Sequence, residues 1–224
     1  MSRIIKQSLW LAFKLAYLAL ILFVIAGILG CSPNQTTSSP TQSFTEPAIP
    51  TNYHTYTDET SSFSISYPPE WEVAQALLEQ LNQTVKDTLK NLSSDLPVEK
   101  ASFIFLAGLP NQGGYSPNVG IVIEPLPTGV KNQDQLIEAA IEGIKLGIPD
   151  FAEISRTKTK IDGIDGSIFE YTGTFPDAPK THYLYMCLYR GQTAWSVTCS
   201  STPEDFDGWK GDFQSIVRSL RILK

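Results

Sequence analysis

The chain has 224 residues, of which 17 are basic and 23 acidic, so its formal net charge is −6. This acidic balance, without a cluster of Lys and Arg that could follow a phosphate backbone, excludes a nucleic-acid-binding protein. Two histidines and three cysteines are the whole supply of those residue types, so few side chains could serve as metal ligands or nucleophiles.

The N-terminal segment has the pattern of an export signal. Basic residues at Arg3, Lys6 and Lys14 precede an unbroken apolar run, residues 15–30, which ends at Cys31. A basic start, an apolar centre and small residues at the end are typical of a cleaved secretory signal. The last four residues of this pattern, "ILGC", resemble the bacterial lipobox, which ends in the cysteine that becomes lipidated.

The lipobox resemblance implies attachment to a membrane through Cys31. Signal peptidase would remove residues 1–30, the Cys31 sulfur would carry a diacylglycerol, and the new amino group would receive a fatty acid such as palmitate. The alternative is an uncleaved membrane helix, which needs about 20 apolar residues. Either way the rest of the chain lies beside a bilayer. We expect an extracytoplasmic location, periplasmic or at the cell surface, or the thylakoid lumen side if the chain is cyanobacterial.

A polar segment separates Cys31 from the folded part. Residues 32–52 contain four prolines among Ser, Thr, Asn and Gln, with Glu46 as the one charged residue. Such a composition buries too little apolar surface to offset its ordering entropy, so residues 31–52 are predicted to be the lipidated cysteine and a flexible linker. Loss of residues 1–30 changes the net charge from −6 to −9, so the lipid, and no basic patch, must provide the anchor.

Residues 53–224 are predicted to form one domain rich in hairpins. Alternating apolar residues and β-branched or aromatic content predict strands in pairs. The predicted pairs are 53–57 with 63–67, 101–107 with 119–124, 152–161 with 167–175, and 182–190 with 193–200. Both Asp-Gly steps of "DGIDG", residues 162–166, are interpreted as turn signals and not as a calcium loop, which needs more oxygen ligands.

Three helices are predicted, one after the first hairpin, one after the second and one after the last. Apolar residues at helical spacing predict a helix over about 75–93 and a second one around 137–148, with Asn132 and Gln135 as a capping box. The third is predicted to start with Thr202 as N-cap and Pro203 at the first helical position. Hairpins that alternate with helices predict an α+β fold, with a mainly antiparallel sheet and helices on both faces as an α/β/α sandwich.

Cys187 and Cys199 lie in one predicted hairpin with its turn near Arg190-Gly191-Gln192. A two-residue turn places the two cysteines on opposite faces of the sheet, and a three-residue turn leaves them several positions out of register. A disulfide is therefore disfavoured, and free buried thiols are expected.

Four stretches together resemble the PsbP-like family. They are "FSISYPPEW", "SPNVGIVIEPLP", "IDGIDGSIFEYTG" and "TAWSVTCSSTPEDFDGWKGDFQSIVRSLRIL", and the resemblance covers Tyr53 to Leu223. The family includes the extrinsic PsbP subunit of photosystem II, bacterial lipoprotein relatives and, by fold, small Ran-binding proteins. It implies an antiparallel sheet between helices and a non-enzymatic role in binding other proteins, which in photosynthetic members stabilises or helps assemble photosystem II.

Motifs for catalysis or for metals are missing from the sequence. His54 and His182 have no metal-ligand spacing and are interpreted as surface residues of strands. The nucleophile elbow and the phosphate-binding glycine loops are also missing. The acidic residues Glu204, Asp205, Asp207 and Asp212 are interpreted as helix-dipole partners on a solvated face. No catalytic residue, metal site or cofactor is therefore predicted.

The candidate binding residues are Tyr115 and Asn118, in the loop "NQGGYSPN". Loops commonly carry binding residues, and Tyr115 would place a large amphipathic side chain at a loop tip; the alternative is a simple connector. Trp71 and Trp195 are interpreted as core. The predicted function is that of a lipid-anchored, non-catalytic protein that binds a membrane protein complex. The alternative is a solute-binding lipoprotein with a pocket between sheet and helix.

Overall fold

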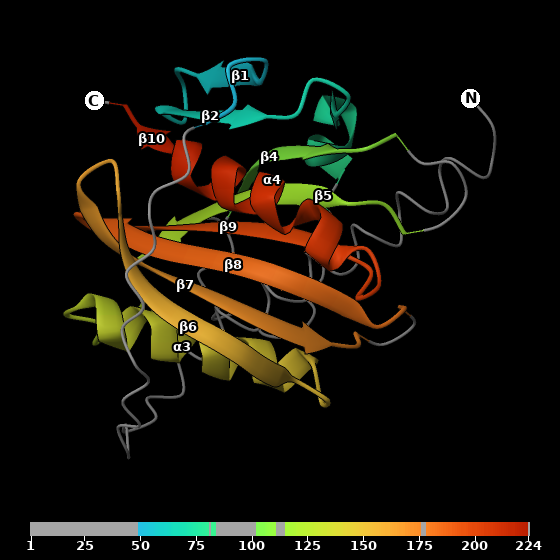
Figure 1. Ribbon diagram of the computed structural model, residues 1–224. Coiled ribbons are helices and arrows are strands. Elements are labelled where there is room, and N and C mark those ends of the chain that lie inside the picture. Colours follow the sequence, from blue (N-terminus) through green and yellow to red (C-terminus); the bar gives the residue numbers. More distant parts are fainter. Residues whose placement is uncertain (1–48, 81, 84–101, 111–114, 176–177, 224) are drawn as a thin grey trace.

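The computed structural model describes residues 49–80, 82–83, 102–110, 115–175 and 178–223. In this part of the chain two antiparallel sheets lie against two long helices (Figure 1). The small sheet has the order β1-β2-β10, with β1 His54–Asp58, β2 Phe63–Tyr67 and β10 Arg221–Ile222. The large sheet has the order β3-β4-β5-β9-β8-β7-β6, with β3 Glu72–Val73, β4 Ser102–Gly108, β5 Asn118–Pro125, β6 Ala152–Ile161, β7 Ile164–Gly173, β8 Thr181–Arg190 and β9 Thr193–Ser201.

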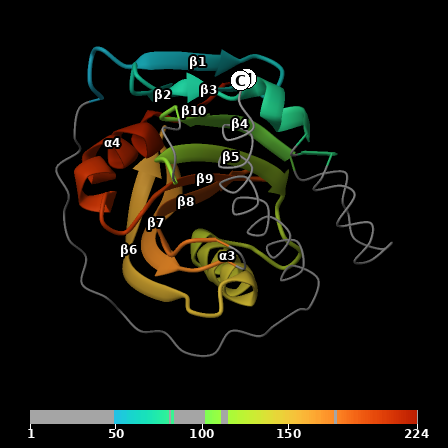
Figure 2. The same ribbon diagram turned by 90° about the vertical axis from the view of Figure 1, so that its right-hand side faces the viewer.

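The helices α3 (Gln133–Gly147) and α4 (Phe206–Ser219) cover opposite faces of the large sheet (Figure 2). Because side chains alternate along each strand, the sheet contributes to two separate cores. One core packs beneath α4 and the small sheet and includes Phe63, Phe105 and Val197, all fully buried. The other packs beneath α3 and includes Phe169 and Tyr171. The predicted α+β sandwich with helices on both faces is confirmed.

The predicted strand pairs are confirmed, and the chain reversals between them explain their registers. Arg190 pairs with Thr193, so the β8–β9 turn consists of two residues, of which Gly191 has a φ of 63°. Cys187 consequently lies opposite Ser196, and Cys199 opposite Leu184. The two thiols belong to different cores and both are free, as a two-residue turn predicts.

The turn between β6 and β7 corrects one prediction. Asp162 and Gly163 have φ values of 51° and 77°, the left-handed pair that a two-residue hairpin turn requires. The second Asp-Gly step, Asp165-Gly166, lies within β7 and pairs with Lys160 and Thr159. The prediction that both steps form turns was therefore wrong, because the first step alone reverses the chain and β7 begins at Ile164.

At the start of α3, one of the two hydrogen bonds of the predicted capping box is formed as expected. The Asn132 side chain accepts a hydrogen bond from the Gln135 backbone N–H at 2.9 Å. The Gln135 side chain reaches back one residue further than expected and accepts from the Lys131 N–H at 2.7 Å. Apolar residues on one side of α3, among them Leu136 and Ala140, are then fully buried against β7 and β8.

The start of α4 differs from the prediction. Thr202 Oγ1 accepts from the Asp205 N–H at 3.2 Å, but residues 203–205 form a turn and the helix begins at Phe206. Thr202 therefore closes the turn before the helix and is not its N-cap, which is Asp205. One face of this segment is apolar and turned inward: Phe206, Phe213, Ile216, Val217 and Leu220 have no exposed surface, and Trp209 is half-buried.

Residues 75–80 and 82–83 are helical, in agreement with the start of the helix predicted over 75–93; the remainder of that prediction lies outside the described residues. Within the part of the chain that the structure describes, none of the helices combines the length and the apolar character needed to cross a bilayer.

Candidate functional site

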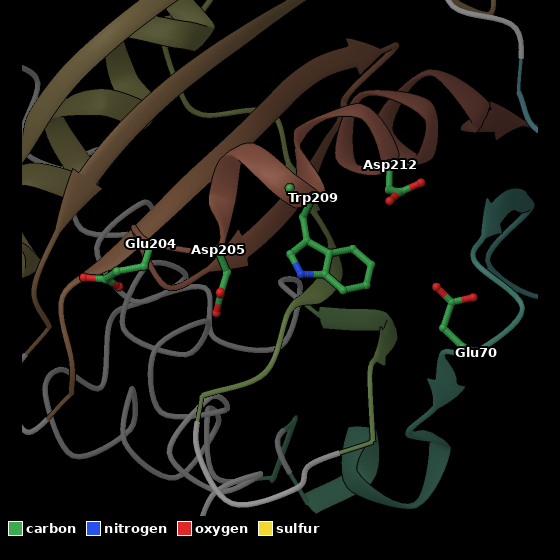
Figure 3. Close-up of a pocket in the computed structure, with 6 residues that line it drawn as sticks. Glu70, Glu204, Asp205, Trp209 and Asp212 are labelled. Atoms are coloured by element: carbon green, nitrogen blue, oxygen red, sulfur yellow. The ribbon is translucent and has the colours of Figure 1, made fainter.

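An acidic depression lies at the beginning of α4. It has a volume of about 430 Å³, is open to solvent, and is lined by Glu70, Glu204, Asp205, Gly208, Trp209 and Asp212. Figure 3 shows Glu70, from the segment between β2 and β3, pointing toward α4, where Trp209 and Asp212 lie. Two segments far apart in the sequence therefore build one surface, which we call the acidic depression.

Prolines and aromatic packing fix the two sides of the acidic depression. Trp71 N–H donates to the Pro68 carbonyl at 3.1 Å, which closes a tight turn with Glu70 at its exposed side. The Trp71 indole is 4% exposed and packs against Trp209, with ring centroids 5.8 Å apart. Trp71 is thus a core residue, as predicted. Trp209 packs on the Trp71 ring and is itself half-buried at the surface.

Tyr53 links the acidic depression to the segment that precedes the domain. Its hydroxyl donates a hydrogen bond of 2.5 Å to Asp212 Oδ1. Burial, followed by the hydrogen bond and charge of Asp212, raises the pKa of the Tyr53 phenol well above its ordinary value. The phenol therefore stays protonated and acts as the donor to Asp212. Since Tyr53 follows directly on the predicted linker, the acidic depression lies where that linker enters the domain.

The charges of the acidic depression indicate what it can attract. Four of its six lining residues are carboxylates and Trp209 supplies an aromatic surface, a combination that suits cationic side chains better than anions. Glu204 and Asp205 also lie at the positive end of the α4 dipole, which stabilises their charge. Among the described residues, no group of three or more His, Cys, Asp and Glu side chains is arranged to hold a metal ion.

His182 is not the surface residue that the sequence suggested. Its side chain is 12% exposed, its ring stacks on Phe206 at 3.5 Å, and its Nε2 lies 2.9 Å from Glu170 Oε1. The second Glu170 oxygen forms an ion pair of 2.7 Å with Lys210. The interpretation failed because α4 packs over this end of β8. His54, by contrast, is exposed as predicted and stacks beside Tyr67.

Burial raises the pKa of Glu170, but the hydrogen bonds and charges of His182 and Lys210 outweigh it and lower the pKa below the ordinary value. Glu170 is therefore a charged acceptor that ties β7 to β8 and to α4. The contacts of Glu170 with His182 and Lys210 thus form a network that joins β7, β8 and α4.

Tyr115 and Asn118 bond within the domain. Ser200 Oγ donates to Asn118 Oδ1 at 3.1 Å, so the Tyr115 hydroxyl is the donor in its 2.7 Å bond to Ser200. Asn118 Nδ2 in turn lies 3.4 Å from the Tyr115 hydroxyl, which completes a ring of three hydrogen bonds. Tyr115 is half-buried against the α3 core and is not at an exposed loop tip. A binding role for Tyr115 and Asn118 stays a prediction.

The space between α4 and the large sheet is filled by the fully buried side chains of Phe206, Phe213 and Ile216. The acidic depression, in contrast, opens outward from the start of α4 and is bordered by carboxylates. The sequence analysis identified Glu204, Asp205 and Asp212 as parts of a solvated acidic face but did not place Glu70 and Trp209 beside them. The Pro68-Pro69 turn was the one available signal, because it fixes where Glu70 points.

Two solved structures resemble this chain over most of its length. One is the solution structure of cyanobacterial PsbP (CyanoP) from Synechocystis sp. PCC 6803, with a TM-score of 0.52 and 13% identity over 82% of this chain and 99% of that chain. The other is LpqN, involved in cell envelope biogenesis of Mycobacterium tuberculosis, with a TM-score of 0.50 and 9% identity over 72% of this chain and 83% of that chain. No protein-family profile and no curated protein matches the sequence.

The chain has a PsbP-like fold. This confirms the resemblance inferred from sequence, whose four stretches fall in β2 and its following turn, in β5, in the β6–β7 hairpin, and in β9 with α4. At these identities the likeness establishes the fold alone. Cys31 and most of the predicted linker lie outside the described residues, so lipidation of this PsbP-like chain stays a prediction.

Proposed function

We propose that the chain is a lipid-anchored, non-catalytic PsbP-like protein on the extracytoplasmic side of a bacterial membrane. The observation that carries the proposal is the sequence around Cys31, where a basic start and an apolar run end in "ILGC". The PsbP-like fold supports it. Two or three acyl chains at Cys31 would hold the domain firmly at the membrane, since each buried methylene contributes about 0.8 kcal/mol.

The proposed task of the domain is to bind a membrane protein complex and to help stabilise or assemble it. If the host is photosynthetic, photosystem II is the first complex to test. The acidic depression is the surface we would examine first, because the Tyr53–Asp212 hydrogen bond joins it to the end of the linker. A partner held in the same membrane would meet this side of the domain within reach of the tether, whose 21 residues span roughly 25 Å on average.

A pull-down from solubilised host membranes tests this function. The tagged full-length chain should recover a stoichiometric membrane protein. Cys31→Ser, made in a chain whose residues 1–30 are replaced by a conventional cleaved secretory signal, should lose most of that recovery because the domain is then no longer held at the bilayer. A matched control is Cys199→Ser, which removes a thiol that is buried inside the domain. Repeated recovery of no partner, or turnover of a substrate by the purified chain, would contradict the proposal.

The second candidate, a solute-binding lipoprotein, would be favoured by a closed apolar pocket with a few convergent polar groups. The acidic depression is open and largely polar, so it supports contact with a macromolecule better than enclosure of a solute.

A further inference from the structure

The strand β1 is weakly attached to the rest of the domain. It has five residues and, in the part of the chain that the structure describes, it pairs with β2 alone, at the outer edge of the small sheet (Figure 2). Among the described strands of five or more residues it is the one without a buried residue, whereas β2 buries Phe63 and Ile65 completely. A segment with few buried contacts can open at a lower free energy than the whole domain.

The direction of the backbone hydrogen bonds shows which amides depend on the pairing of β1 with β2. The Ser66 N–H donates to Ser219 Oγ at 2.8 Å, so Ser66 directs its backbone groups away from β1. Thr55 lies opposite Ser66, and the two form a non-hydrogen-bonded pair, because antiparallel pairs alternate between the two kinds. The N–H groups of Tyr56 and Asp58, one and three positions further along, therefore point to β2 and are bonded there.

The next amide of β2 belongs to the opposite side of the small sheet. The Leu223 N–H donates to the Ser62 carbonyl at 2.8 Å, so the same alternation makes Ser64 and Arg221 a hydrogen-bonded pair between β2 and β10. The Ser64 N–H thus depends on β10 and not on β1. Release of β1 would expose the amides of Tyr56 and Asp58 and leave the Ser64 amide protected.

Two side-chain contacts beyond the β1–β2 ladder hold this segment to the domain. The Tyr53 hydroxyl bonds to Asp212 on α4, and the half-buried Tyr56 ring packs on Phe105, with centroids 5.0 Å apart. The fully buried Phe63 and Ile65 belong to β2. Opening of β1 therefore breaks a small set of contacts and leaves the main apolar anchors of the small sheet in place.

We infer that residues 53–58 form a strap, which peels from β2 as a unit while the rest of the domain stays folded. Opening of the strap adds up to about 20 Å to the segment that leads into the domain, at 3.3–3.6 Å per extended residue. It also frees Asp212, in the acidic depression, from Tyr53. The use of this added length as membrane tether rests on the proposed function, whereas the peeling of the strap does not.

Hydrogen exchange of the full-length chain in mild detergent, followed amide by amide by NMR, tests the strap. The Tyr56 and Asp58 amides should exchange at least about tenfold faster than the Ser64 amide. Their exchange should respond little to low concentrations of urea, because opening of the strap exposes little surface. Equal rates and equal urea dependence at the three amides would overturn the inference, since β1 would then open only together with the whole small sheet.

A reversible disulfide gives a matched comparison within one variant. Thr55 and Ser66 lie opposite each other with their hydroxyl oxygens 3.0 Å apart, so Thr55→Cys together with Ser66→Cys places two thiols within reach of a disulfide. The oxidised variant should exchange its Tyr56 and Asp58 amides as slowly as its Ser64 amide, and reduction should restore the fast exchange. Fast exchange that persists in the oxidised variant would overturn the inference.

The Tyr53 hydroxyl provides a further test that needs no new cysteine. Tyr53→Phe should speed exchange at Tyr56 and Asp58 about fivefold, as expected for the loss of one hydrogen bond. Tyr115→Phe, the same chemical change at a hydroxyl bonded to Ser200, should leave these two rates unchanged, and equal effects of both variants would contradict the strap. None of these measurements requires lipid at Cys31, so failure of the strap and failure of the proposed anchor are distinguishable.

Discussion

Tyr53 and Asp212 lie 159 positions apart in the sequence, and a hydrogen bond of 2.5 Å joins their side chains. The bond connects the residue that begins the domain to the middle of its last long helix. It also orients one of the carboxylates of the acidic depression. The attachment point of the linker and the candidate binding surface are therefore parts of one local structure.

Removal of the Tyr53 hydroxyl should weaken this connection. Tyr53→Phe is expected to lower the free energy of unfolding by about 1 kcal/mol, the usual net value of such a bond, as measured by urea denaturation of the full-length chain. Tyr56→Phe, a half-buried tyrosine whose ring packs on Phe105, should have a smaller effect. Equal stabilities of Tyr53→Phe and the parent chain would show that the bond contributes nothing.

Glu170→Gln should destabilise the domain, because it removes the charge that His182 and Lys210 share. The expected loss is about 1–2 kcal/mol at neutral pH, as for hydrogen bonds to a charged group. The folded-state pKa of Glu170 is lowered, so this stabilisation is present above the ordinary carboxyl pKa and is lost as the pH falls below it. Denaturation curves of both proteins should therefore converge in acid; a difference that grows in acid would contradict the assignment.

The effect of Glu124 on stability should depend on pH in the opposite direction to that of Glu170. It is 7% exposed, and burial raises its pKa well above the ordinary value. A raised folded-state pKa means that stability is greatest when the carboxyl is protonated and falls as the pH rises through the folded value. Glu124→Gln should accordingly be more stable than the parent by about 1 kcal/mol or more at high pH. Thermal unfolding between pH 5 and pH 9 would show this, and a parent chain that is the more stable one at pH 9 would refute it.

Charge reversal in the acidic depression should weaken partner binding without unfolding the domain. Glu204→Lys and Asp205→Lys change exposed side chains beside Trp209. Because Glu204 lies at the positive end of the α4 dipole and Asp205 is the N-cap of α4, we expect a loss of stability of about 1 kcal/mol or less for Glu204→Lys and of about 1–2 kcal/mol for Asp205→Lys. Recovery of the membrane partner in the pull-down should fall at least fivefold. Glu79→Lys, an exposed carboxylate outside the depression, serves as the control. Equal recovery by all three variants would assign binding to another surface.

Local sequence patterns predicted much of this fold. The hairpins and the apolar faces of α3 and α4 follow from periodicity and turn residues that act over a few positions. Cys187 and Cys199 could even be assigned to opposite faces, given a two-residue turn. What the patterns could not supply is the order β5-β9 in the sheet and the return of β10 to β2, because these contacts join segments that are distant in sequence.

The candidate site was harder to predict for the same reason. His182 and Tyr115 were expected to be accessible, yet α4 covers the first and Ser200 binds the second. Both expectations relied on residue type and on position in a strand or loop, and neither property reports which distant element packs above. The carboxylates on α4 were visible in the sequence, but their neighbour Glu70 became apparent only when the chain folded.

Mass spectrometry of the N-terminal peptide from protein isolated from host membranes is the most direct test of the proposed anchor. We predict that the chain begins at Cys31, with a diacylglycerol on the sulfur and a fatty acid on the amino group. A chain that begins at Met1, or a Cys31 that carries no lipid, would contradict it.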